Sequence, residues 1–141
     1  MLDKERVLSK IDELDRYLFE LKEVVPVSFA EYQKIEKKRS CERLLQLCIE
    51  SVIDICKLFV SGLALGLPSE ENDLFNKMRK KEILSQEMVI VLKEMRGFRN
   101  ILIHEYTAID DELVYDAAKE KLTDFNKFKT EILNILKKVE K

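Results

Sequence analysis

The chain has 141 residues, of which 46% are hydrophobic and 37% charged, and its formal net charge is −2. A chain of this length is typical of one domain and can bury a core without disulfides or metal ions, so we expect a single domain over residues 1–141. The nearly balanced charge excludes a global attraction for nucleic acid, and any contact with RNA would have to use a local basic patch.

Only three residues are glycine, two are proline and none is tryptophan. A sheet needs turn residues at each reversal of the chain, whereas a sequence rich in leucine, isoleucine, lysine and glutamate favours helices, so the composition predicts an all-α fold. Residues 2–6 do not resemble a signal peptide, and the longest apolar segment, residues 44–67, contains Glu50, Asp54 and Lys57, which a membrane span would avoid. We expect a cytoplasmic protein without membrane contact.

The first predicted helix spans about residues 3–24 and has an apolar stripe along one side. The stripe consists of Val7, Ile11, Leu14, Leu18, Leu21 and Val25. Pro26 ends this helix because the residue before a proline is pushed out of the helical conformation. Ser28, followed by Glu31 three residues later, has the pattern of a capping box and predicts the start of the next helix.

The second predicted helix spans about residues 29–65. Its first third is strongly charged, but over residues 44–59 apolar side chains surround nearly the whole helix. Such a helix must be covered on most sides, which implies a second subunit if the neighbours within one chain do not suffice. Gly62, Gly66 and Pro68 are expected to end it.

Three cysteines, Cys41, Cys48 and Cys56, lie in this helix at spacings of seven and eight residues, which puts them along one face. Cysteines of a single helix cannot reach the geometry of a disulfide. We interpret them as small core residues in a reducing cytoplasm and not as metal ligands.

Further helices are expected in the second half of the chain. A short helix is predicted around residues 72–80, and a longer one opens at Ser85. A last helix runs from an N-cap at Asp110 or Asp111 through Val139. These elements predict an antiparallel four-helix bundle with an additional short helix, assembled as a dimer.

The only histidine, His104, lies among polar side chains at the end of the helix that opens at Ser85. Arg96, Arg99 and Asn100 crowd the same segment, and a tyrosine follows at Tyr106. A bundle does not need so many polar groups for its stability, because burying them costs free energy unless each is paired. The alternative is an ordinary helix C-terminus, at which the histidine interacts with the helix dipole and an arginine pairs with a carboxylate.

The spacing constrains how these groups could act together. On a continuous helix Arg99 and His104 would diverge by about 140° and lie about 7.5 Å apart along the axis. They could flank one groove if the helix ends near His104 or if a second subunit closes the gap. His104 and Tyr106 share a side only where the backbone is extended.

Residues 99–106 have the sequence Arg-Asn-Ile-Leu-Ile-His-Glu-Tyr, which resembles the Arg-x4-His-x-Tyr signature of the HEPN superfamily, and specifically its HepT-like toxin branch. Residues 42–55, the Gly-Leu-Pro turn at residues 66–68 and residues 95–99 are also similar to that branch. The resemblance covers essentially the whole chain. It implies a metal-independent endoribonuclease without a cofactor, usually a homodimer whose two motifs meet across the subunit interface.

The residues themselves fit such an enzyme. Cleavage of RNA by its own 2′-hydroxyl needs a proton-transfer group with a pKa near neutrality, which His104 offers, and a cation on the phosphorane, which Arg99 offers. The chain has no cluster of metal ligands and no glycine-rich phosphate loop. One histidine cannot easily act as base and acid at once, whereas a two-fold site would supply two.

Tyr106 has several possible roles. In HepT-like proteins the matching tyrosine is the target of an adjacent nucleotidyltransferase antitoxin, which attaches AMP to it. The added phosphate would repel an RNA phosphate beside Arg99. From its chemistry alone, Tyr106 could also stack on a base, donate a hydrogen bond to a phosphate, or simply pack.

Three further residues are candidates for supporting roles. Asp54 lies in an otherwise apolar helix, where a buried carboxylate needs a partner such as Arg99 or Asn100, unless Asp54 is solvated at the helix edge. Asn100 either orients the motif or bonds locally. Arg96 is either a phosphate contact or part of a surface ion pair.

The leading hypothesis is the ribonuclease toxin of a toxin–antitoxin pair, which acts on RNA as a homodimer and is neutralised by a nucleotidyltransferase. The alternative is a non-catalytic module that binds a nucleotide or a nucleotidyltransferase partner at the same cleft. A third possibility is a purely structural helical dimer. The presence of both Arg99 and His104 favours the toxin hypothesis over this third one. The basic runs within residues 34–43 and 77–81 are either RNA contacts or solvated faces.

Overall fold

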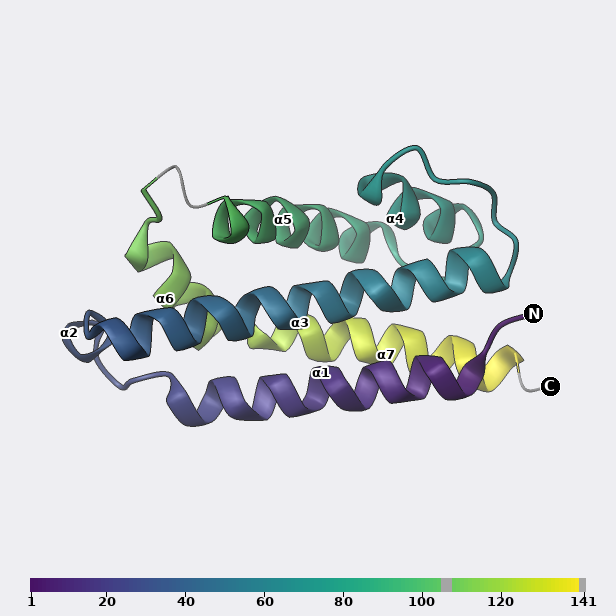
Figure 1. Cartoon of the computed structure of the whole chain (residues 1–141). Coiled ribbons are helices and arrows are strands. Elements are labelled where there is room, and N and C mark those ends of the chain that lie inside the picture. The colour runs from purple at the N-terminus through teal and green to yellow at the C-terminus, as the bar shows by residue number, and fades with distance from the viewer. Residues whose placement is uncertain (105–107, 140–141) are drawn as a thin grey trace.

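A computed structural model describes residues 1–104 and 108–139, which form seven helices. The helices are α1 (Lys4–Val24), α2 (Phe29–Tyr32), α3 (Ile35–Gly62), α4 (Glu71–Lys80), α5 (Gln86–Ile103), α6 (Asp111–Glu120) and α7 (Leu122–Val139). The four longest, α1, α3, α5 and α7, lie lengthwise and alternate in direction, and α4 lies beside α5 at one end (Figure 1). The predicted all-α class is confirmed.

The first helix forms as its sequence pattern predicts. The side chain of Asp3 caps α1 by accepting a hydrogen bond from the backbone N–H of Arg6 at 3.1 Å. The helix ends at Val24, and Val25 before Pro26 is extended. The buried side of α1 consists of Val7, Ile11, Leu14, Leu18 and Leu21. This stripe packs on α3 in the most extensive helix contact of the described chain.

The prediction of one continuous helix over residues 29–65 is wrong. Ser28 does start a helix, since its Oγ accepts from the N–H of Glu31 at 3.2 Å, but α2 ends at Tyr32 and α3 begins at Ile35 after an extended Lys34. The physical reason is the burial of Tyr32, whose ring centroid lies 5.2 Å from that of Tyr115 in α6. The break lets α2 turn this ring toward α6 while α3 keeps its own axis.

The prediction of one helix from residue 110 to Val139 is also wrong, because the helix is broken at Lys121. Asp110 caps α6 as expected, with Oδ1 accepting from the N–H of Glu112 at 3.0 Å. The two parts bury different surfaces. α6 contacts α2 and α3, whereas α7 turns a longer stripe into the core. That stripe consists of Leu122, Phe125, Phe128, Ile132 and Leu136.

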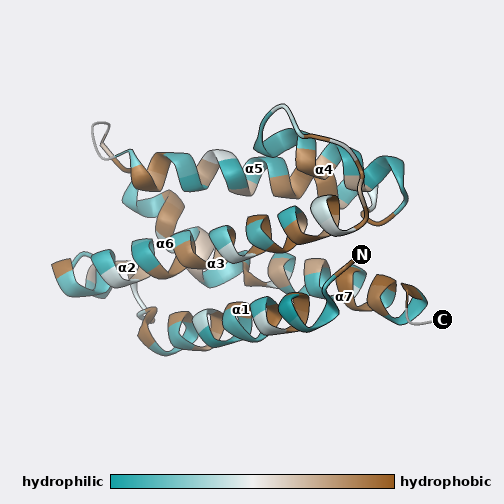
Figure 2. Cartoon of the chain, turned by 45° about the vertical axis from the view of Figure 1, so that its right-hand side comes forward, coloured by the Kyte–Doolittle hydropathy of each residue, from teal (hydrophilic) through white to brown (hydrophobic). Residues whose placement is uncertain are grey.

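The apolar helix α3 is the centre of the fold and is covered from within the chain. Helices α1, α2, α4, α5 and α6 all pack against it. Its apolar character therefore does not by itself require a second subunit, which corrects the argument made from the sequence. Polar and apolar residues alternate along the surrounding helices, so that each presents an apolar side (Figure 2). No helix in the described ranges is both long and apolar enough to cross a membrane.

The three cysteines are buried in this core with free thiols, as the sequence predicts. Burial raises the pKa of Cys41 to about 11 and that of Cys48 to about 12, and it raises the pKa of Cys56 further still. All three thiols therefore remain protonated near neutral pH and behave as small apolar groups.

We expect Phe128→Ala to lower the free energy of unfolding by about 3–5 kcal/mol, because the fully buried ring leaves a cavity among α7 and its neighbours. Phe19→Ala is the matched control, since this ring on α1 is 64% exposed and its removal should change stability by less than about 0.5 kcal/mol. Chemical denaturation followed by circular dichroism measures both. Equal losses in the two variants would contradict this description of the core.

Candidate functional site

Helix α5 positions three of the predicted site residues on one side. It begins after Ser85, whose Oγ accepts from the N–H of Met88 at 3.1 Å. Arg96, Arg99 and Asn100 follow at positions that are three and four residues apart, so they share a face of the helix. Arg99 is only 9% exposed although its guanidinium is always charged. A buried cation of this kind needs partners.

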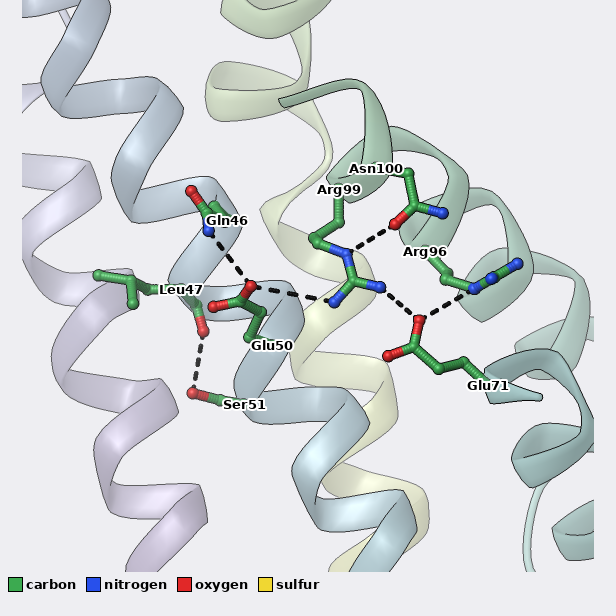
Figure 3. A network of polar contacts seen from close by, with 8 residues as sticks. All are labelled: Gln46, Leu47, Glu50, Ser51, Glu71, Arg96, Arg99 and Asn100. Atoms are coloured by element: carbon green, nitrogen blue, oxygen red, sulfur yellow. Dashed lines mark hydrogen bonds and ion pairs between the residues drawn. The ribbon is translucent and has the colours of Figure 1, made fainter. Parts of the chain in front are cut away.

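The partners of Arg99 come from three helices. Its Nε donates to Oδ1 of Asn100 at 3.0 Å, and its Nη2 donates to Oε1 of Glu71 at the start of α4. Its Nη1 lies 3.9 Å from Oε2 of Glu50 on α3. Figure 3 shows the guanidinium between the two carboxylates. All three nitrogen positions of the guanidinium are thus engaged by side chains of the same chain.

Glu71 joins a second arginine to the first. Its Oε1 also accepts from Nε of Arg96 at 3.0 Å, so one carboxylate oxygen bridges both guanidinium groups. Burial raises the pKa of the Glu71 carboxyl, but the hydrogen bond from Arg96 and the charge and hydrogen bond of Arg99 outweigh burial and hold that pKa below its usual value. Glu71 is therefore ionised throughout the physiological range.

Glu50 is held from its own helix. Nε2 of Gln46, one turn earlier on α3, donates to Oε2 of Glu50 at 3.2 Å. This is the same oxygen that lies nearest to Arg99. The hydrogen bond fixes the carboxylate toward α5, so that Arg99 has an acidic group on the α3 side as well as on the α4 side (Figure 3).

Of the two interpretations of Asp54 left open by the sequence, the one in which it pairs with Arg99 or Asn100 is wrong. Its Oδ2 pairs with Nζ of Lys10 on α1 at 3.4 Å, and its side chain is 42% exposed. Asp54 therefore lies toward α1 and solvent, which corresponds to the solvated alternative, and it does not contact Arg99 or Asn100. The acidic residue of α3 that faces Arg99 is Glu50, one turn earlier.

His104 marks the end of α5. Its backbone N–H donates to the carbonyl of Asn100 at 3.1 Å, and its φ and ψ of −97° and 83° are no longer helical. The side chain is exposed. The helix therefore ends directly at His104, which meets one of the two conditions for Arg99 and His104 to flank a common groove. Tyr106 lies outside the residues that the structure describes.

Glu50 and Glu71 are the residues that sequence reasoning missed. Glu71 has no local signal, because an acidic residue in the first turn of a helix is explained by the helix dipole alone. Glu50 could have been found as the helical neighbour of Asp54, one turn away on the same apolar helix. Only the packing of α4 and α3 against α5 shows that both carboxylates meet Arg99.

The arrangement offers two kinds of chemistry. Two guanidinium groups lie side by side, and Arg96 is 25% exposed and turns its terminal nitrogens away from Glu71 (Figure 3), where they can bind a phosphate. An exposed imidazole, His104, follows on the same helix end, and imidazole is a common proton-transfer group in enzymes.

Comparisons with known proteins agree with this chemistry. The chain matches the ribonuclease HepT-like family over residues 14–132. It is 31% identical to the tRNA nuclease HepT of Aphanizomenon flos-aquae over 83% of this chain and 80% of that protein. It is 32% identical to the mRNA nuclease HepT of Shewanella oneidensis over 60% of this chain, a match that spans 63% of that protein.

A solved structure extends the similarity to nearly the full chain. The tri-AMPylated Shewanella oneidensis HEPN toxin in complex with MNT antitoxin superimposes with a TM-score of 0.86 and 27% sequence identity. The superposition covers 95% of this chain and 99% of the toxin.

Proposed function

This chain belongs to the HepT-like family of ribonucleases and is an endoribonuclease, and we propose that it is the toxin of a toxin–antitoxin pair with Arg99 and His104 as catalytic residues. The observation that carries the assignment of these residues is the end of α5. There a buried guanidinium held by two carboxylates is followed, within five residues, by an exposed histidine at the helix terminus. Neither group is needed by the apolar core.

The proposed reaction is transesterification within the RNA. The 2′-hydroxyl oxygen attacks the adjacent phosphorus and gives its proton to a neutral imidazole, while the bond from phosphorus to the 5′-oxygen breaks and that oxygen takes up a proton from a second, protonated imidazole. The products are a 2′,3′-cyclic phosphate and a 5′-hydroxyl. Arg99, with Arg96 beside it, stabilises the charge on the pentacovalent phosphorane. Nothing in this scheme requires a metal ion or a cofactor.

We further propose that the active species is a homodimer. A single imidazole cannot be neutral as the base and protonated as the acid in the same step, whereas two subunits supply two His104 side chains. The last turn of α5 supports this assembly, because the apolar side chains of Ile101 and Ile103 beside His104 are exposed. Exposed apolar residues that adjoin a functional site are suited to a subunit contact.

The proposed protein partner is a nucleotidyltransferase antitoxin, in keeping with the complex of the Shewanella toxin. AMP attached to Tyr106 would put a phosphate two residues from His104 and close in sequence to Arg99, where its negative charge would oppose an RNA phosphate. The competing proposal is a non-catalytic module that binds a nucleotide or this partner without cleaving RNA. An RNA-cleavage assay separates the two.

The first test of function is cleavage in the presence of EDTA. We expect the purified protein to cleave a transcribed tRNA or mRNA and to leave a 2′,3′-cyclic phosphate, which mass spectrometry of the fragments detects. His104→Ala should lower the rate on the order of 10²- to 10³-fold without changing the thermal midpoint, because the side chain is exposed. Activity that is lost in EDTA and restored by magnesium would refute the mechanism.

A substitution of Ile103 tests whether the protein acts as a homodimer. Ile103→Asp should convert the protein from dimer to monomer in sedimentation velocity at micromolar concentration and abolish cleavage, because a charge would be buried in the contact. Ile90→Asp is the matched control, since this residue lies on the same helix at its opposite end with 51% exposure, against 40% for Ile103. A wild-type protein that sediments as a monomer while remaining active would rule out the shared site.

The role of Tyr106 is tested by Tyr106→Phe, which keeps the ring and removes the hydroxyl that an AMP group would need. If the hydroxyl serves only neutralisation, cells that produce this variant should stop growing even when the antitoxin is present. If it contacts RNA, the variant should be weaker in the absence of the antitoxin. Full toxicity together with full neutralisation would remove Tyr106 from the site.

A further inference from the structure

Glu71 connects two arginines that are otherwise independent. It is the first residue of α4, and its Oε1 accepts a hydrogen bond from Arg96, 25 residues later in the sequence, and another from Arg99, 28 residues later. Glu70 directly before it makes no side-chain cap of α4. The charge of Glu71 is thus directed across to α5, toward both guanidinium groups, and not toward its own helix end.

The bridge restricts how each arginine can lie. Arg99 is engaged through Nε, Nη1 and Nη2, and a buried arginine held in this way has lost the rotamer freedom of a free one. Arg96 is held only through Nε, so its terminal nitrogens remain directed away from Glu71 (Figure 3). Glu71 is therefore the one carboxylate that links the positions of both cations before any substrate arrives.

We propose that Glu71 is a positioning residue of the nuclease site, which holds Arg96 and Arg99 together as a preorganised pair for the scissile phosphate. The proposal rests on the proposed function, since it concerns the same site. A preorganised cation stabilises the transition state without paying for reorientation during the reaction. Glu71 itself touches no reacting atom in this account and acts only through the two arginines.

The other carboxylate of the cluster cannot replace it. Glu50 approaches Arg99 only at 3.9 Å and is itself held by Gln46. It makes no contact with Arg96. Without Glu71, two guanidinium groups one helical turn apart would repel each other. Arg99 would keep its contacts with Asn100 and Glu50, but the contact that links Arg96 to it would be lost, and with it the pair.

The test compares four variants by steady-state kinetics on a transcribed tRNA. Glu71→Ala should lower kcat at least about tenfold with a smaller change in KM, because it removes an interaction that matters mainly in the transition state. Glu71→Asp keeps the charge and should recover part of that loss. Glu70→Ala, at the exposed neighbouring residue, is the matched control and should behave as wild type. If the Glu71→Ala variant does not fold, Glu71→Gln replaces it, because glutamine has nearly the same shape as glutamate.

A second readout follows the arginine directly and needs no activity. In nitrogen-15 NMR spectra the Nη2–H signal of Arg99, the group that donates to Glu71, should be protected from exchange in wild type and Glu70→Ala, and it should shift and exchange faster in Glu71→Ala or Glu71→Gln. An unchanged Arg99 signal overturns the proposal, whether or not kcat falls. So does a kcat of Glu71→Ala equal to that of Glu70→Ala. If wild type cleaves no RNA, the proposed function fails, while the NMR result still decides whether Glu71 positions Arg99.

Discussion

A guanidinium group cannot give up its charge in a protein, so burying Arg99 obliges the fold to surround it with acceptors. Much of the local architecture serves that requirement. Helix α4 buries Leu74, Phe75 and Met78 against its neighbours α3 and α5, and this packing brings Glu71, at its first residue, onto α5. Helix α3 adds Glu50 from the other side. The two carboxylates balance the charges of the two arginines within one cluster.

Much of the fold could be predicted because local sequence signals show where most of the helices begin or end. The stripe and Pro26 define α1, and Ser85 and Asp110 cap their helices as expected. The two breaks that were missed, after Tyr32 and at Lys121, have no glycine or proline to signal them. They follow from contacts between distant segments, such as the ring of Tyr32 against α6, which no local pattern contains.

The sequence predicts the site residues that share one helix, but not those that come together from different helices. Arg96, Arg99 and Asn100 lie three and four residues apart, and the structure brings them together as that spacing implies. The acidic partner was sought at Asp54 because it interrupts an apolar run, but burial patterns do not say which neighbour a carboxylate faces. Glu71 belongs to a separate short helix, and only tertiary packing reveals its role.

A crystal structure with bound RNA would show whether the Arg99 cluster and His104 act on an RNA phosphodiester. An oligonucleotide with 2′-O-methyl groups cannot supply the attacking hydroxyl and would remain intact in the crystal. We expect a phosphate within hydrogen-bond distance of Arg96 or Arg99, with the imidazole of His104 beside the methylated 2′-oxygen. RNA bound on another face, with His104 far from any phosphate and the arginine cluster unoccupied, would contradict this expectation.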